Sequence, residues 1–391
     1  MMRYTIFFIV CMILCSLIPF HAVPQQKGKF RKYSGGTEPL FEDFNDLARD
    51  SAGIRIVFYN LENLYDPFND SLTNDDEFTP EGAKHWNYGR YITKIQYLAK
   101  NLLAIGGWEP PEIIGVCEAE NRNVLNKLIF DTPLSAYHYR IIHHESPDPR
   151  GVDVALLYRP DKITVLSDTA IPVVIVPDTV ARTRDILYAR LLVMGKDTLH
   201  VFVNHWPSRF GGYMQTVEKR ALTAAILRRF ADSVQHCDSL ANIVIMGDLN
   251  DDPQDESISR VLLAGDGKLE AGGGKQPVQG NPDNGGVTRE PPESDLVNLM
   301  TGNTLRGYAG TLKHGETWHT FDQFIVSRAL AMGAGNLEIP LTQMLIFRAP
   351  YLLVEDPNRF GSKLNRTYLG PRYLGGFSDH LPIFLDITIK H

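Results

Sequence analysis

Short runs of apolar residues, each bounded by polar residues, recur along the chain from residue 54 to residue 389. Runs of this length that are rich in β-branched residues are typical of strands buried in a sheet. We therefore expect strands at 54–59, 113–117, 152–158, 163–176, 186–194, 199–204, 243–247, 321–327 and 383–389. The run at 243–247 is followed by Asp248, Leu249, Asn250 and Asp251, so this strand delivers polar side chains to the edge of a sheet.

Two longer stretches between these strands repeat their apolar residues with helical spacing. They span 88–105 and 216–235, and in the second we expect the alanines to face inward and Arg220, Arg228 and Arg229 to face outward. Shorter helices are expected before residue 130 and at 255–264. Because strands and helices alternate without a repeat or a separating linker, the pattern favours one α/β domain.

The N-terminus has the pattern of an export signal. Arg3 precedes an apolar run at 4–20, which is somewhat short for a membrane span of about 20 residues. We expect a signal peptide at 1–24, a polar tail at 25–52 and the folded domain at 53–391, with a Gly/Pro-rich loop insertion at 265–294. The chain would be periplasmic or extracellular, without stable membrane insertion once the signal is removed. A retained signal anchor and a lipoprotein cut before Cys15 are the alternatives.

Composition narrows the class of partner. The 391 residues are 43% hydrophobic and 22% charged, as in a globular protein. The formal net charge of −7 argues against broad electrostatic binding of nucleic acid, but not against a local basic groove or a contact bridged by metal. Cys117 and Cys237 lie outside the signal, and whether they pair stays open. Neither belongs to a C-x-x-C motif, which argues against zinc.

Polar residues of the kinds that bind metals and phosphates follow or open the predicted strands. They are Asn60, Glu62, Glu118, Glu120, His205, Asp248, Asn250, Asp322, Asp379 and His380. Their oxygen ligands suit Mg²⁺, with Mn²⁺ or Ca²⁺ as alternatives. Two histidines beside a metal suit acid–base hydrolysis of a phosphate ester. Each residue alone is explained at least as well by a strand end, a turn or a helix start, so the set carries the argument.

Competing motifs do not match. An EF-hand beginning at Asp248 would have Pro253 where glycine is needed and Ser259 where glutamate is needed. The sequence contains no G-x-S-x-G, P-loop, H-E-x-x-H or G-x-G-x-x-G motif.

Six short pieces stand in a fixed order between residues 54 and 389: N-L-E, I-G-V-C-E, V-N-H-W, G-D-L-N-D, F-D-Q-F-I-V-S and S-D-H-L-P. Together they resemble the endonuclease/exonuclease/phosphatase superfamily, whose members include deoxyribonuclease I. The resemblance implies an exported bacterial-type member with a catalytic domain over 53–391. It also implies an α/β fold, a four-layered α/β sandwich of two mixed β-sheets face to face with helices outside.

The resemblance also implies metal and acid–base roles at the matching positions. Glu118 would be the main metal ligand, with Asn60 positioning metal or phosphate and Asp379 at the metal site. His205 matches the first catalytic histidine, and His380 resembles the general base.

Roles for the remaining positions follow in the same way. Asp248 and Asn250 would bind phosphate and orient the nucleophile, and Asp322 would buttress His380. Family nucleases often place an acid beside the first histidine, for which Asp153 is the candidate. Glu62 and Glu120 suit either the site or its loops. Arg209 is a candidate phosphate ligand, and Trp206 would narrow the pocket or stack on a base.

The sequence therefore predicts an exported, Mg²⁺-dependent phosphodiester hydrolase, with nucleic acid as the favoured substrate and a nuclease as the favoured activity. A phosphatase or a phospholipid or sphingomyelin phosphodiesterase of the same superfamily is the alternative. A binding module that keeps the fold without catalysis is a third. No basic stripe interleaved with aromatic residues marks a nucleic-acid groove, so the substrate stays open, as do protein partners.

Overall fold

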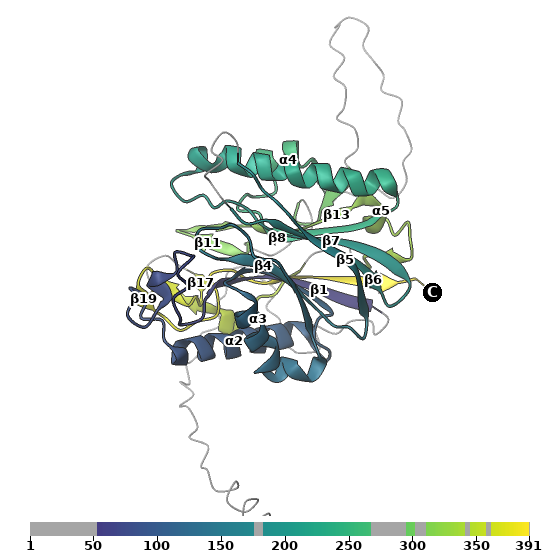
Figure 1. Ribbon diagram of the computed structural model, residues 1–391. Coiled ribbons are helices and arrows are strands. Elements are labelled where there is room, and N and C mark those ends of the chain that lie inside the picture. The colour runs from purple at the N-terminus through teal and green to yellow at the C-terminus, as the bar shows by residue number, and fades with distance from the viewer. Residues whose placement is uncertain are drawn as a thin grey trace, which may run out of the picture. The chain divides into compact units, whose positions relative to one another are not determined.

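Two mixed β-sheets form the centre of the protein (Figure 1). The computed structural model describes residues 53–175, 183–266, 295–301, 310–340, 345–356 and 361–390. The predicted signal peptide and tail, and most of the predicted 265–294 insertion, lie outside these residues.

The first sheet contains the chain's first and last strands side by side. In spatial order it runs through β14 (Leu337–Glu338), β20 (Ile383–Ile389), β1 (Gly53–Leu64), β2 (Ile113–Ala119), β4 (Asp153–Tyr158) and β3 (Arg140–His143), and β15 (Leu345–Ile346) also pairs with β20. β1 and β2 are parallel, and the other pairs are antiparallel.

The second sheet is built mainly from the middle of the chain. In spatial order it runs through β5 (Ile163–Ile171), β6 (Ile186–Val193), β7 (Asp197–His205), β8 (Asn242–Asp248), β13 (Asp322–Ser327), β10 (Leu296–Asn298) and β9 (Ala264–Asp266). β7 pairs with β8 in parallel, as β9 does with β10. The side chains that follow β7 and β8 therefore leave the sheet at the same edge.

Helices cover the outer faces of both sheets (Figure 1). α2 (Tyr88–Gly106) and α3 (Arg122–Phe130) lie against the first sheet, and α4 (Tyr213–Cys237) lies against the second. The predicted four-layered α/β sandwich is confirmed. Among the described residues, no helix has the length and apolar character needed to cross a membrane.

Short elements connect these layers. They are the hairpins β11 (Leu312–His314) with β12 (Thr317–His319), β16 (Leu353–Glu355) with β17 (Ser362–Leu364) and β18 (Tyr368–Leu369) with β19 (Arg372–Tyr373), and the short helices η2 (Asp76–Phe78), η3 (Pro133–Tyr137), η4 (Ser257–Val261), α5 (Arg328–Ala331) and η6 (Pro350–Leu352).

Strand β8 shows why the apolar runs lack a period of two. Val244 and Met246 belong to the core between the sheets, while Ile243 and Ile245 belong to the core under α4. Successive side chains of a strand point to opposite faces, and here both faces are covered, so both must be apolar.

Two glycines in the sequence motifs are required by close packing. A Cβ on Gly115 of β2 would lie 2.5 Å from the Met246 side chain in the opposite sheet. A Cβ on Gly247 would lie 2.4 Å from the backbone oxygen of Asn204 in β7. Glycine lets the two sheets, and the ends of β7 and β8, approach more closely than any other residue would.

The structure corrects the predicted orientation of α4. Arg220 is fully buried and its Nε lies 2.8 Å from Asp251 Oδ1. The outward prediction was wrong for Arg220 because its ion-pair partner comes from another segment, which helical periodicity does not reveal. Arg229 is exposed as predicted, whereas Ala225, predicted to face inward, is exposed as well. Cys117 is buried in β2 and Cys237 is exposed at the end of α4, and both are free.

Candidate active site

Asp248, the last residue of β8, lies at the centre of the predicted residues. Its Oδ2 is 3.1 Å from Asn60 Nδ2 and 3.7 Å from Nε2 of both His205 and His380. Its Oδ1 accepts the backbone N–H of Asn250 at 3.0 Å. Only 2% of Asp248 is exposed, so these nitrogens replace the water that a surface carboxylate would have.

Strand register explains why three of these residues are neighbours. His205 pairs with Asp248 across the β7–β8 ladder, and Asp322 pairs with Asp248 across the β8–β13 ladder. Directly paired residues have side chains on the same face of a sheet and about 5 Å apart at Cβ. An imidazole and two carboxylates are therefore placed in a row before any loop contributes.

Irregular backbone brings in residues from the facing sheet. The β1–β2 and β2–β4 ladders shift register at Asn60 and at Cys117, where the next paired residues are Leu64 and Ala119. Glu118 lies at the second shift with φ of 60°, a left-handed conformation that is costly for a residue with a Cβ. Asn250 has φ of 52° at the end of β8. Such bulges redirect single side chains at the rim of a sheet.

Asp322 and His380 form a tight buried pair. Asp322 Oδ2 is 2.7 Å from His380 Nδ1, which leaves Nε2 directed to the Asp248 side. Burial by itself lowers the pKa of His380, but attraction to Asp322 and Asp248 and the Asp322 hydrogen bond outweigh it, so this pKa lies well above its usual range.

The direction of this shift bears on the role predicted for His380, because the protonated form of an imidazole donates a proton and does not accept one. Burial raises the pKa of Asp248 to about 7; nearby Asp322 and Glu118 add to the shift, while His380 and the Asn250 N–H oppose it. Because a general base works best with a pKa near the operating pH, Asp248 is a second candidate for the proton acceptor beside His380.

His205 differs from His380 in its surroundings. Burial, with the positive charges of Arg184 and Arg150 and of His380 nearby, holds the pKa of His205 well below its usual range. Its ring is therefore neutral at neutral pH. Its Nδ1 is buried without a hydrogen-bond partner among the described residues, whereas carboxylate oxygens of Asp248 and Glu118 lie 3.7 Å from its Nε2.

Glu118 has one carboxylate oxygen fixed and the other directed into the cluster. Its Oε2 accepts the Asn63 N–H at 2.8 Å, and its Oε1 is 3.7 Å from His205 Nε2. Asp379 is held by Arg366 through a 2.7 Å ion pair. Glu118, Asn60 and Asp379 offer only oxygen donors to a cation, and this donor set fits Mg²⁺, Mn²⁺ or Ca²⁺ better than zinc.

Glu62 and Glu120 hold loops rather than approach Asp248. Glu62 accepts the backbone N–H groups of Thr367 and Tyr368 at 2.6 and 3.2 Å. Glu120 accepts the backbone N–H of Asp66 at 2.7 Å. Both glutamates are almost fully buried, so each fastens a loop to the end of a central strand.

Asp153 belongs to a separate group, which corrects its predicted place beside His205. Its Oδ2 lies 3.1 Å from His143 Nε2, and its Oδ1 accepts from the backbone and hydroxyl of Ser146. Asp153, His143 and Glu145 form a group in which one candidate ligand atom from each residue lies within 4.8 Å of the other two. Hydrogen bonds already occupy both oxygens of Asp153, so the group is explained without an ion.

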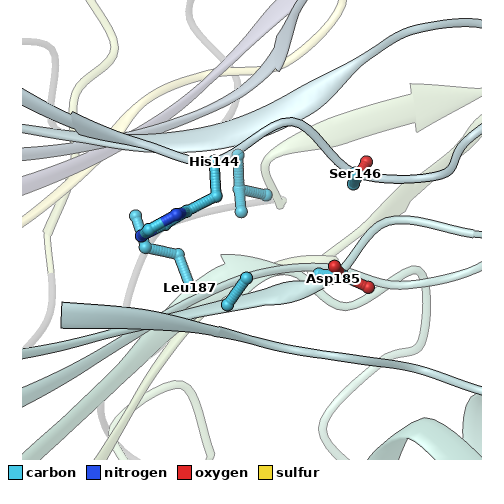
Figure 2. A pocket seen from close by; sticks show the side chains of 6 residues that line it. His144, Ser146, Asp185 and Leu187 are labelled. Atoms are coloured by element: carbon cyan, nitrogen blue, oxygen red, sulfur yellow. The ribbon is translucent and has the colours of Figure 1, made fainter.

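A small pocket lies beside this group, lined in part by His144, Ser146, Asp185 and Leu187 (Figure 2). Its volume is close to 10 Å³, about what one water molecule needs. It is therefore too small to be a substrate site.

Trp206 and Arg209 also differ from their predicted roles as substrate contacts. Trp206 is 0% exposed and packs in the core under α4, so it cannot stack on a base. The Arg209 guanidinium is ion-paired with carboxylates of the turn after β8. Neither the burial of Trp206 nor the ion pairs of Arg209 could be predicted from the sequence, because tryptophan and arginine are also common in binding sites.

Two residues near the cluster were not predicted. Arg184 donates to the Trp206 carbonyl at 2.7 Å and pairs with Asp148 at 2.8 Å, directly behind His205. Ser378 donates to the Asn60 carbonyl at 2.8 Å and accepts the His380 N–H, tying the last motif to β1. Ser378 stands within S-D-H-L-P and could have been included, whereas no motif marks Arg184.

A comparison with family models identifies the family of this chain. A model of the Endonuclease/Exonuclease/phosphatase family matches residues 55–277 and 284–389. The chain belongs to the endonuclease/exonuclease/phosphatase family. Members of this family are hydrolases that act on phosphoester bonds, typically with a divalent metal. No curated protein matches the chain.

Solved structures of several family proteins are similar to this chain at low identity. The human Nocturnin catalytic domain with bound sulfate anion is 15% identical, with 87% of this chain and 95% of that chain covered and a TM-score of 0.49. Truncated Caenorhabditis elegans TDP2 is 15% identical, with coverage of 86% and 98% and a TM-score of 0.48. An endonuclease/exonuclease/phosphatase family protein from Bacteroides thetaiotaomicron is 12% identical, with coverage of 86% and 94% and a TM-score of 0.48.

Proposed function

We propose that this protein is an exported, Mg²⁺-dependent phosphodiester hydrolase that acts on nucleic acid. The observation that carries the proposal is the convergence on Asp248 of Asn60 and both histidines, within 3.7 Å of one carboxylate oxygen. A buried carboxylate beside one charged and one neutral imidazole supplies a proton acceptor and donors to developing negative charge.

The residues divide the work of hydrolysis as follows. Asp248 accepts the proton of the attacking water, and Asn250 and Asn60 orient groups around it. His380, held by Asp322, gives its Nε2 proton to the leaving oxygen, and Asp248 then returns to His380 the proton it took from water. Neutral His205 donates a hydrogen bond to a phosphoryl oxygen in the transition state.

Glu118, Asn60 and Asp379 would hold the divalent cation. When bound, it would polarise the phosphate and stabilise negative charge on it. The left-handed backbone of Glu118 supports this assignment, because costly conformations persist where a side chain must be aimed.

One partly exposed arginine near Glu118 supports a substrate with more than one phosphate. The side chain of Arg150 is 45% exposed, and the charge of Glu118 acts on it. A backbone phosphate beside the scissile phosphate is the group that such an arginine binds in nucleic acids.

The test is a substrate panel of plasmid DNA, RNA, sphingomyelin, inositol phosphates and a generic phosphodiester, each with Mg²⁺ and with a chelator. We expect Mg²⁺-dependent cleavage of DNA or RNA that the chelator stops. Hydrolysis of the lipid or the inositol phosphates alone would overturn the nucleic-acid assignment but keep the assignment as a phosphoester hydrolase. If no member of the panel is hydrolysed, the proposal that this protein is an active enzyme is overturned.

Export is proposed from the apolar run at 4–20 behind Arg3. Expression of the full chain in a Gram-negative host and N-terminal sequencing of the product provide the test. We expect a periplasmic or secreted product that begins near residue 25. A cytoplasmic product that retains residues 1–24 would contradict the proposal.

A further inference from the structure

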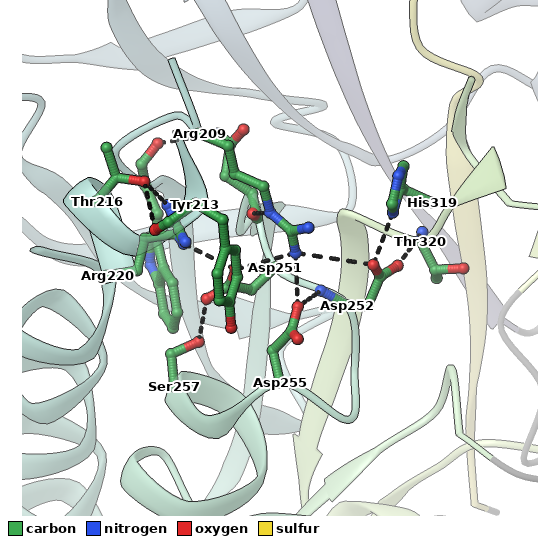
Figure 3. A network of polar contacts seen from close by, with 12 residues as sticks. Arg209, Tyr213, Thr216, Arg220, Asp251, Asp252, Asp255, Ser257, His319 and Thr320 are labelled. Carbon is green, nitrogen blue, oxygen red and sulfur yellow. Dashed lines mark hydrogen bonds and ion pairs between the residues drawn. The ribbon is translucent and has the colours of Figure 1, made fainter. Parts of the chain in front are cut away.

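Arg209 lies where the segments after β7 and β8 meet (Figure 3). Its Nε donates to the backbone oxygen of Asn250 at 2.8 Å. Its Nη2 donates to Asp255 Oδ2 at 2.6 Å and to Asp251 Oδ1 at 3.1 Å. One guanidinium thus holds both ends of the turn that follows Asp248.

Aromatic rings fix the plane of this guanidinium. Its central carbon lies 4.5 Å from the Phe321 ring centre and 4.9 Å from that of Tyr213. The side chain is 25% exposed. The planar guanidinium of arginine can stack on aromatic rings and donate several hydrogen bonds in a fixed geometry, and the ammonium group of lysine cannot do both.

The acidic turn around Arg209 is itself tied to two other elements. Asp251 pairs with buried Arg220 of α4 at 2.8 Å and accepts the Ser257 hydroxyl at 2.6 Å. Asp252 accepts the Thr320 backbone N–H at 2.7 Å, two residues before Asp322.

The network therefore touches all three segments of the second sheet that carry the site. His205 precedes Arg209 on one segment, Asp248 and Asn250 precede the turn on the next, and Asp322 follows Thr320 on the third. Asn250 has a left-handed backbone, so its carbonyl and side chain keep their direction only while partners hold them.

We propose that Arg209 is a positioning residue that acts through Asn250 and the 251–255 turn to align the ends of β7, β8 and β13. This proposal deepens the proposed function and rests on it. Arg209 does not bind substrate phosphate. Its Nε and Nη2 are already engaged, and a phosphate here would meet the carboxylates of Asp251, Asp252 and Asp255.

Arg209→Lys tests the proposal, because lysine keeps the charge and loses the fork. We expect kcat to fall about 10-fold or more with KM within about 2-fold, since small misplacements of catalytic groups are costly. Arg228→Lys is the matched control. Arg228 also donates to a backbone carbonyl, that of Leu262, and pairs with a carboxylate, Asp232, but on α4 away from the cluster.

Hydrogen exchange of peptides covering 246–253 gives a second readout that does not need activity. We expect faster exchange there in Arg209→Lys and no change in Arg228→Lys. Unchanged kcat and unchanged exchange would overturn the positioning role. A large rise in KM with unchanged exchange would instead make Arg209 a substrate ligand, which also overturns it.

Asp255→Asn is a second variant that tests the proposal if Arg209→Lys does not fold. It weakens the 2.6 Å contact to Nη2 and the 2.7 Å hydrogen bond that the same oxygen accepts from the Asp252 backbone N–H, and it leaves the Asn250 contact in place. We expect a smaller change in the same direction in exchange and in kcat, and no change in either would refute the proposal. If the wild type proves inactive on every substrate, the proposed function fails, while the exchange result still decides the role of Arg209.

Discussion

Asp248 combines features that rarely occur together at a structural carboxylate. It is buried, two imidazoles and an amide face one of its oxygens, and burial raises its pKa to about 7. A buried carboxylate is destabilising unless neighbours offset its desolvation. A role in catalysis therefore explains the arrangement, because ionisable groups with shifted pKa values that converge in one cluster mark functional sites.

The Asp322–His380 pair gives a prediction at the same scale. Replacement of Asp322 by Asn removes the charge that raises the His380 pKa, while the Asn carbonyl oxygen can still accept from Nδ1. We expect the rate to fall by about 10² or more, and the His380 pKa, followed by NMR, to drop towards its usual value of about 6.5.

Asp161→Asn is the control for this experiment, because Asp161 also makes a 2.7 Å ion pair, with Arg159, at the surface. It should leave both the rate and the His380 titration unchanged. A near-normal rate in Asp322→Asn would show that the pair is structural.

At the scale of elements, the site depends on irregular ends of regular strands. Left-handed backbone occurs near the end of β1, at Glu62 and Asn63, and near the end of β2, at Glu118. It also occurs two residues after β8, at Asn250. Glutamates 62 and 120 then fasten the neighbouring loops through backbone N–H groups. The sheets hold the site residues in fixed positions, and the irregular strand ends set the directions of their side chains.

The loop contact of Glu120 gives a prediction about pH and stability. Burial raises the pKa of Glu120 to about 8 from 4.5. A carboxyl whose pKa rises on folding stabilises the folded state while protonated, and this stability is lost as pH rises from about 4.5 to about 8.

Glutamine imitates the protonated form and can still accept the Asp66 N–H. We therefore expect Glu120→Gln to raise Tm by a few °C at pH 8 and to match the wild type near pH 4.5. Thermal melts in chelator across this range provide the measurement. A lower Tm for the variant at pH 8 would show that the charged form is the one stabilised by folding.

At the scale of the whole molecule, the two-sheet sandwich brings together residues from position 60 to position 380. The strands that carry them were predictable, because apolar runs buried on both faces are conspicuous in a sequence. The long helices and the set of polar strand ends followed from the same pattern and from its resemblance to a family.

Other features depended on contacts that a linear pattern does not contain. The bulge that aims Glu118 looks in sequence like an ordinary strand end. Arg220 faces inward because of Asp251, and Asp153 turns to His143 because of strand register. Trp206 is in the core because it packs in the same buried cluster as Ala224 and Leu227 of α4.

Metal binding should stabilise the whole domain through Glu118. A ligand that binds only the folded state raises Tm, and at about 100 times its Kd it contributes about 2.7 kcal/mol. We expect Mg²⁺ to raise Tm by a few °C over chelator in the wild type and to have little effect in Glu118→Gln. An equal rise in both proteins would place the cation elsewhere, with the group around Asp153 as the next position to test.

The most direct test of the central claim is the hydrolysis rate of Asp248→Asn on the substrate that the panel identifies. The substitution keeps the shape and the acceptor oxygen, and removes the charge and the proton acceptor. We predict a loss of about 10² or more in rate at saturating Mg²⁺, with an unchanged circular dichroism spectrum. Turnover within a few-fold of the wild type would contradict the placement of Asp248 at the centre of the site.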